Sequence, residues 1–251
     1  MLNCPALRAD NLLGFLAALG VCRLTNSRLA WQHNGPLWCA ALDTDETIDH
    51  LAEFLLGRCK ANPLDGLERA LKLTVDQWLS LPPEWSAAIG TERADGFMIA
   101  QIIAVRGGSK QFPVSNIDKI TTGLTVDDMR AALIGPWLRH PKFGMRWEPS
   151  EWHRHGDEWD DPSELPSMVA RGPTRLAVEG LPLVPTLSPT SASMFRGRKP
   201  ESVRWPVWKE PLIPEAVRGR VLAGVGEMTW ECQRHHTGQA QYSFTAVRAV
   251  R

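Results

Sequence analysis

The segment LLGFLAALGVCRL (residues 12–24) decides how this chain folds. It is apolar on nearly every side, so the helix that it predicts should lie at the centre of the hydrophobic core. Asp10 or Asn11 can cap that helix at its first turn. The small residues Gly14, Ala17 and Ala18 would let a neighbouring element approach this helix closely.

The rest of the N-terminal half contains signals for a hairpin and several helices. RLAWQ and LWCAAL are two strand-like runs joined by a turn at residues 33–36. Residues 94–105 are apolar enough for a buried helix or a strand, and periodicity does not separate the two. Helices are predicted from Thr44 to Cys59, from Leu67 to Leu79 and from Thr125 to Leu133, the last one ended by Gly135-Pro136.

The C-terminal half has fewer helix signals and more strand signals. Gly172-Pro173 opens and Gly180 closes a short helix, TRLAVE, while residues 181–194 are rich in Pro, Ser and Thr and predict irregular backbone. The tail predicts a hairpin of EMTWECQR and QYSFTAVRAV around a turn at HHTG. We therefore expect an α+β fold, with a mainly helical N-terminal domain over 1–143 and a basic, loop- and strand-rich region over 144–251.

Charge is balanced overall but unevenly distributed. The formal net charge is zero, yet residues 1–100 carry 8 basic and 12 acidic side chains. Residues 148–164 carry 1 and 7, whereas residues 165–251 carry 12 and 6. A neutral protein of this kind is expected to touch a polyanion with one face and protein partners with another, and charge scattered over a solvated surface is the alternative interpretation.

Cysteine usage and hydropathy exclude several classes. Five cysteines without C-x-x-C spacing argue against both a disulfide framework and a zinc ribbon. The apolar run Asn11–Cys22 is shorter than the roughly 20 residues that span a bilayer, and it lacks the features of a signal peptide. A cytoplasmic location is expected, and nothing in the sequence calls for a cofactor.

Arginines beside proline and tryptophan between residues 171 and 212 suggest polyanion binding rather than catalysis. Arginine offers a planar fork for phosphate oxygens. Trp205 and Trp208 could stack on bases, although anchoring in the core is the preferred interpretation. The candidate phosphate contacts are Arg171, Arg175, Arg196, Arg198, Lys199 and Arg204.

Two further groups of residues suggest specific chemistry. The glycine-bearing loop 106–110 resembles only a fragment of a phosphate loop, but it would let Lys110 approach phosphates. His153, His155 and Asp157 could bind a divalent metal and activate water, which leaves a metal-dependent nuclease or hydrolase as an alternative. A solvated acidic loop is the preferred interpretation of that run. A protein–protein adaptor without nucleic-acid contact is a second alternative.

Four segments resemble proteins encoded in type I-G (formerly I-U) CRISPR loci. The apolar opening of that group ends in A-x-L-G-x-x-R, as this chain does within residues 7–24. The other similar segments are R-W-E-P (Arg146–Pro149), R-G-P-T-R-L-A-V-E-G-L-P-L-V-P (Arg171–Pro185) and R-W-P-V-W (Arg204–Trp208). Where the group has R-G-A-N-x-L-A, this chain reads R-G-P-T-R-L-A, and it is short for a large subunit.

The resemblance implies a non-catalytic, large-subunit-like component of an RNA-guided Cascade complex. Such a subunit lies near the 5′ end of the guide, inspects the motif that flanks the target and helps to hold the opened duplex. Lys110 and Gln111 would then present donors to base edges, and residues 165–251 would follow phosphates. The implied partners are guide RNA, target DNA, other Cascade subunits and the helicase-nuclease recruited for degradation.

Overall fold

The computed structural model describes residues 1–65, 72–93, 96–99, 113–141, 144–148, 168–184, 202–236 and 242–250. Over these residues the chain has a mixed α+β fold, which confirms the predicted fold class. The helices are α1 (Leu12–Thr25), α2 (Ile48–Arg58), α3 (Val75–Leu79), α4 (Pro83–Ile89), α5 (Pro113–Thr121), α6 (Val126–Ile134), α8 (Arg171–Gly180) and α9 (Pro214–Ala223), with a 3-10 turn η2 (Leu181–Leu183). The strands are β1 (Leu2–Arg8), β2 (Arg28–Asn34), β3 (Leu37–Asp43), β4 (Lys72–Leu73), β5 (Gly90–Arg93), β6 (Gly96–Ile99), β7 (Arg139–Pro141), β8 (Met168–Ala170), β9 (Ser202–Val207), β10 (Met228–His236), β11 (Tyr242–Phe244) and β12 (Arg248–Val250).

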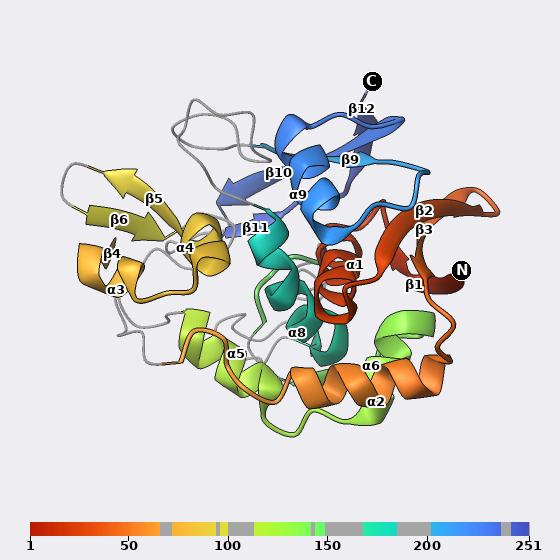
Figure 1. Ribbon diagram of the computed structural model, residues 1–251, viewed down its shortest axis with the longest axis horizontal. Helices are drawn as coiled ribbons and strands as arrows, with labels where there is room; N and C mark the ends of the chain where they lie inside the picture. The colour runs from red at the N-terminus through yellow and green to blue at the C-terminus, as the bar shows by residue number, and fades with distance from the viewer. Residues whose placement is uncertain are drawn as a thin grey trace, which may run out of the picture.

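Helix α1 forms where the sequence predicts it. The Asn11 side chain accepts a hydrogen bond from the Gly14 backbone N–H at 3.2 Å, so Asn11 is the N-cap. Asn26 follows the last turn in the left-handed conformation that often ends helices. Every residue from Leu12 to Cys22 is buried, and Figure 1 shows the helix in the middle of the molecule.

Helix α8 packs directly against α1, and glycines at the crossing allow it. A Cβ at Gly20 would lie 1.8 Å from the Leu176 carbonyl oxygen, and a Cβ at Gly180 would lie 2.2 Å from the Leu16 carbonyl oxygen. These positions must therefore lack a side chain. Gly180 keeps a helical backbone with φ of −77°, so it does not close α8 in the left-handed way that a terminal glycine predicts.

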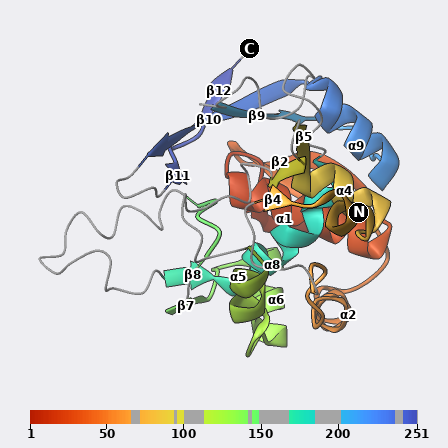
Figure 2. The same ribbon diagram turned by 90° about the vertical axis from the view of Figure 1, so that its left-hand side faces the viewer.

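Two antiparallel sheets flank this helix pair. The first has the order β1-β3-β2, and its β2 edge is covered because Leu29 and Leu212 exchange backbone hydrogen bonds of 2.8 and 3.0 Å. In the second, β10 pairs with β9 on one side and with β11 and β12 on the other. Smaller antiparallel sheets pair β4-β6-β5 and β7-β8. Figure 2 shows β9, β10 and β12 as an outer layer above α1.

Aromatic side chains join the second sheet to α1 and to the first sheet. The Phe15 ring lies 5.5 Å from Trp31, 5.8 Å from Trp205 and 6.4 Å from Trp208, measured between centroids. Trp205 Nε1 donates to the Ala9 carbonyl oxygen at 2.7 Å, and Trp208 Nε1 donates to the Leu29 carbonyl oxygen at 2.9 Å. One core thus crosses the boundary that the sequence predicts between residues 143 and 144.

Several predicted elements differ from the observed ones. Thr47, not Thr44, caps α2, because its hydroxyl accepts from the His50 N–H at 3.3 Å. The helix predicted over 67–79 is wrong at Lys72–Leu73, which form strand β4, although α3 follows. Gly96–Ile99 form a strand, which decides the helix-or-strand question for that part of 94–105. His235 and His236 belong to β10 and not to the turn of the tail hairpin.

Other predictions are confirmed. The hairpin β2–β3, the Thr125 cap of α6 and the pairing of β10 with β11 lie where the sequence places them. Strands β1 and β9 and helix α9 were not predicted. Among the described residues, no helix combines the length and the apolar character needed to cross a membrane.

Replacing Gly20 by Ala should loosen the contact between α1 and α8. The added methyl group would overlap the Leu176 carbonyl oxygen, and overpacking of this kind costs about 1–3 kcal/mol of the free energy of unfolding. The melting temperature should then fall by roughly 2–4 °C per kcal/mol for a chain of this size. Thermal and urea unfolding measure both quantities.

Gly219 in α9 is the matched control, because a Cβ there meets nothing within 4 Å. Gly219→Ala should raise the free energy of unfolding by about 0.5–1 kcal/mol through helix propensity. Equal stability of the Gly20→Ala variant and the parent protein would contradict the close contact.

Candidate functional site

Thr125 and Asp128 form the N-terminal cap of α6 and hold a carboxylate inside the protein. The Thr125 hydroxyl accepts from the Asp128 backbone N–H at 3.2 Å, and Asp128 Oδ2 accepts from the Thr125 backbone N–H at 2.9 Å. This reciprocal pair is a capping box. Only 1% of the Asp128 side chain is exposed, so its negative charge needs partners inside the fold.

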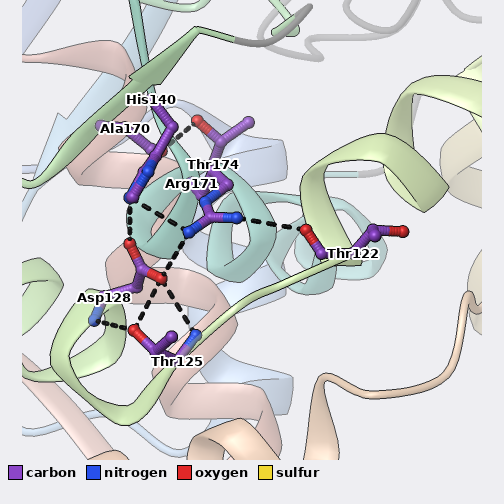
Figure 3. A network of polar contacts seen from close by, with 7 residues as sticks. All are labelled: Thr122, Thr125, Asp128, His140, Ala170, Arg171 and Thr174. Atoms are coloured by element: carbon purple, nitrogen blue, oxygen red, sulfur yellow. Dashed lines mark hydrogen bonds and ion pairs between the residues drawn. The ribbon is translucent and has the colours of Figure 1, made fainter.

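Arg171, at the start of α8, and His140, from β7, supply those partners (Figure 3). Arg171 Nη2 lies 3.1 Å from Asp128 Oδ2, and Arg171 Nη1 donates to the Thr122 carbonyl oxygen at 3.1 Å. His140 Nε2 lies 2.7 Å from Asp128 Oδ1. Because an ionised carboxylate only accepts, we assign the hydrogen to Nε2 of His140. The 3.2 Å approach of that nitrogen to Arg171 Nη2 is then a contact between two donors.

The environment of Asp128 favours its ionised form. Burial acts to raise the pKa of the Asp128 carboxyl, but hydrogen bonds from Thr125 and His140 and the positive charge of Arg171 outweigh it. The net pKa of Asp128 lies below its usual value. The carboxylate therefore stays charged at neutral pH and ties α6, β7 and α8 together.

A second ionic group lies further along α8. Arg175 is completely buried, and its Nε and Nη2 donate to the carbonyl oxygens of Cys59 and Ala61 at 3.2 and 2.7 Å. Its Nη1 lies 2.7 Å from Glu179 Oε1. Arg23 Nη1 donates to Glu179 Oε2 at 2.6 Å, so this group links α8 to α1 and to the end of α2.

Arg171 and Arg175 lie inside the fold and not at its surface. Both were predicted to contact a polyanion, but Arg171 is 7% exposed and Arg175 is fully enclosed. The reason is that α8 is buried along its whole length, so its arginines must find their partners within the fold. In this conformation neither guanidinium is presented to a phosphate.

Arg204 has the opposite placement. It lies on β9, where Val203 and Trp205 point into the core and the Arg204 side chain is 44% exposed. Trp205 and Trp208 are buried and hydrogen-bonded, which confirms the preferred interpretation of both as core anchors. The exposed arginine is thus held in place by the buried residue beside it.

The remaining predicted site residues lie outside the part of the chain that the structure describes. These are Lys110, Gln111, Arg196, Arg198 and Lys199, together with the metal candidates His153, His155 and Asp157. Their roles stay predictions. Among the described residues, no three His, Cys, Asp or Glu side chains are grouped closely enough to hold a metal ion.

All five cysteines are buried free thiols. Burial raises the pKa of Cys4, Cys22 and Cys59 to about 12, and it also raises that of Cys39 and Cys232. A thiol of such high pKa is protonated at neutral pH and is a poor nucleophile. These cysteines act as small core side chains.

A cavity of about 440 Å³ opens between the end of α1 and the start of α2. Glu46, Glu53 and His50 line it, together with the half-exposed ring of Phe54. Its walls belong to the acidic first hundred residues, and it contains no predicted site residue.

Sequence reasoning missed Asp128 and His140, and also Glu231 and Arg248, whose side chains pair across strands β10 and β12. The pattern Thr125-x-x-Asp128 is a capping-box signal and could have indicated the first of these. The other three acquire their partners through pairing of distant segments, which no local pattern reveals. The charge partner of Arg204, for example, is Glu231, 27 positions further along the chain.

No protein-family model and no curated protein sequence matches the chain.

Asp128→Asn should make the protein less stable and less sensitive to acid. Breaking a buried ion pair leaves Arg171 uncompensated and lowers the free energy of unfolding by about 3–5 kcal/mol at pH 7. Because the folded-state pKa of Asp128 is lowered, its stabilisation is present above the unfolded value of about 3.9 and is lost as the pH falls through the folded value. The variant should therefore show a shallower loss of stability below about pH 4.

The neighbouring Asp127→Asn is the control, since its carboxylate is 72% exposed and pairs with Arg130 at the surface. It should change the free energy of unfolding by less than about 1 kcal/mol. Urea unfolding between pH 3 and pH 7 measures both variants. Similar losses in the two variants at pH 7 would show that the buried network does not stabilise the fold.

Proposed function

We propose that the chain is a non-catalytic subunit of a type I-G RNA-guided CRISPR surveillance complex, acting in the cytoplasm. In this role it binds target DNA, guide RNA or both. The observation that carries the proposal is the ordered set of family-like segments, which runs from one end of the chain to the other. They are Leu7–Leu24, Arg146–Pro149, Arg171–Pro185 and Arg204–Trp208.

The packing of three of these segments supports treating them as one pattern. The first contains α1, the third contains α8, and these two helices meet at Gly20 and Gly180. The fourth supplies Trp205, which bonds to Ala9 within the first. Tightly packed cores tolerate few substitutions. A resemblance concentrated in such segments is therefore what we expect between chains that share a fold.

The distribution of charge supports two kinds of partner. The net charge of +6 over residues 165–251 suits nucleic-acid phosphates, and Arg204 lies at the surface of that region. The acidic residues 1–100 and their cavity beside α2 suit other Cascade subunits or the recruited helicase-nuclease. Base pairing with the guide reads the target sequence in such complexes, so this subunit needs contacts and no chemistry of its own.

The predicted contacts at Lys110, Gln111, Arg196, Arg198 and Lys199 belong to this proposal. Lys110 and Gln111 would donate to base edges of the flanking motif. Lys199 lies three residues before Ser202, where β9 begins, so in the sequence the basic cluster leads directly to Arg204.

Binding of labelled single-stranded DNA and RNA at several salt concentrations tests the proposal. The affinity should fall steeply as salt rises, because each phosphate contact releases counterions. Arg196→Ala with Arg198→Ala should weaken binding and lower the slope of log affinity against log salt by about 0.7 for each lost contact with a single strand. The measurement uses the full chain, alone and assembled with a guide-bearing complex.

Arg28→Ala with Arg58→Ala is the control, because it removes two exposed arginines from the acidic region. It should leave the slope unchanged. If neither the free nor the assembled chain binds nucleic acid, the adaptor alternative is correct. If metal-dependent cleavage appears and His153→Ala abolishes it, the enzyme alternative is correct.

A further inference from the structure

Three charged residues stand in one row across the second sheet. Arg204 on β9 pairs in register with Glu231 on β10, and Glu231 pairs in register with Arg248 on β12. Residues directly opposite one another on neighbouring strands have their side chains on the same face. The three side chains therefore form a ladder, which we call the arginine strip.

The strip lies on the outer face of the sheet. Trp205 and Cys232, which alternate with its members along β9 and β10, are buried in the core. The side chains of Arg204 and Arg248 are 44% and 64% exposed. Figure 2 shows β9, β10 and β12 as the layer farthest above α1, so this face looks away from the molecule.

Glu231 sits between the two arginines and is itself only 4% exposed. Arg204 Nη2 lies 3.4 Å from Glu231 Oε2, and Arg248 Nη2 lies 3.4 Å from the same oxygen. One carboxylate thus draws two guanidinium groups together and leaves the strip with a net charge of +1. Contacts of this length are weak hydrogen bonds. Glu231 therefore orients the two guanidinium groups and leaves their other donors available.

Each arginine keeps donors for another partner. Only Nη2 of Arg204 and Nη2 of Arg248 contact Glu231, and their Nε and Nη1 groups make no hydrogen bond to the described residues. The Nε and Nη1 hydrogens lie on opposite edges of a guanidinium group, so each can donate to a separate phosphate oxygen. This differs from Arg175, whose Nε and Nη2 bond to backbone carbonyls inside the fold.

The surroundings of the strip favour an extended anion. Ser202 and Gln233 face each other in the next row of the same face, and both are uncharged. The backbones of Arg204 and Arg248 are two strands apart, about 10 Å, but both Nη2 atoms lie 3.4 Å from one Glu231 oxygen, so the guanidinium groups are closer together than that. They can therefore contact neighbouring phosphates of one strand. A cationic and polar surface of this kind suits a repeating chain of phosphates better than a single small anion.

We propose that the arginine strip binds the phosphodiester backbone of a nucleic-acid strand, with Arg204 and Arg248 contacting separate phosphates and Glu231 positioning both. The inference deepens the function proposed above and rests on it for the identity of the polyanion. It assigns a binding role to Arg248 and a positioning role to Glu231, and both residues lie outside the family-like segments.

The test is Arg204→Gln with Arg248→Gln, measured with labelled single-stranded DNA and RNA of about 30 nucleotides. Binding should weaken about tenfold at low salt, and the slope of log affinity against log salt should fall by about 1.4 for two lost phosphate contacts. Comparing the DNA and RNA arms shows which strand the strip prefers. Arg28→Gln with Arg58→Gln removes the same charge elsewhere and should change neither quantity.

A triple variant keeps the test valid if the double variant is unstable. Arg204→Gln, Glu231→Gln and Arg248→Gln together leave no unpaired buried carboxylate, and this variant should lose binding to the same extent. Circular dichroism and thermal unfolding establish that both variants are folded.

The outcomes separate the two proposals. Unchanged affinity and slope in both strip variants, with binding still lost in Arg196→Ala with Arg198→Ala, overturn the arginine strip and leave the proposed function intact. Binding lost in the strip variants, for a chain that never assembles with a guide-bearing complex, supports the strip and contradicts the CRISPR role. Nucleic-acid binding that is unchanged while assembly with another subunit fails would assign the strip to a protein partner and overturn the inference.

Discussion

The close contact between α1 and α8 is the constraint on which the rest of the structure depends. At Gly20 and Gly180 the helix backbones approach so closely that a single methyl group would overlap a carbonyl oxygen. This distance places α8 entirely inside the protein and sets where its polar side chains must lie. Interiors packed at this density relax little, so the contact also fixes neighbouring elements such as α6, where a Cβ on Gly172 would lie 2.1 Å from the Asp128 carbonyl oxygen.

Four arginines of the C-terminal half, Arg171, Arg175, Arg204 and Arg248, fall into two groups with different physics. Arg171 and Arg175 lie in low-polarity surroundings, where each needs a carboxylate or carbonyl partner, and parting them from those partners is expensive. Arg204 and Arg248 lie on a sheet face where water remains available and their contacts with Glu231 are long. Buried pairs of the first kind penalise wrong arrangements of the helices. Exposed arginines of the second kind can exchange a weak internal contact for an external one.

How far the sequence could predict this arrangement depends on the range of the interactions involved. The capped apolar helix at residues 12–24, the hairpin that follows it and the Thr125 cap arise from neighbours in sequence, and all three were predicted. Arg171 and Arg204 have the same chemistry and lie in similar proline-rich contexts, yet one is buried and the other exposed. That difference comes from packing of α8 on α1 and from the register of β9 with β10, which join segments far apart in the chain. Strand β9 was not predicted because Pro206 lies within it and proline is disfavoured in the interior of a sheet. Among the described strands β9 pairs only with β10, and proline is tolerated in a strand with one partner.

Native-state hydrogen exchange tests most directly whether the α1–α8 contact holds the fold together. Amides in the middle of both helices should exchange only through global unfolding, with one shared opening free energy equal to that measured in urea. Elements outside this pair, such as α9, should open at lower free energies. If α8 amides exchanged through a local opening well below the global value while α1 stayed protected, α8 would be a peripheral element and the account would be wrong.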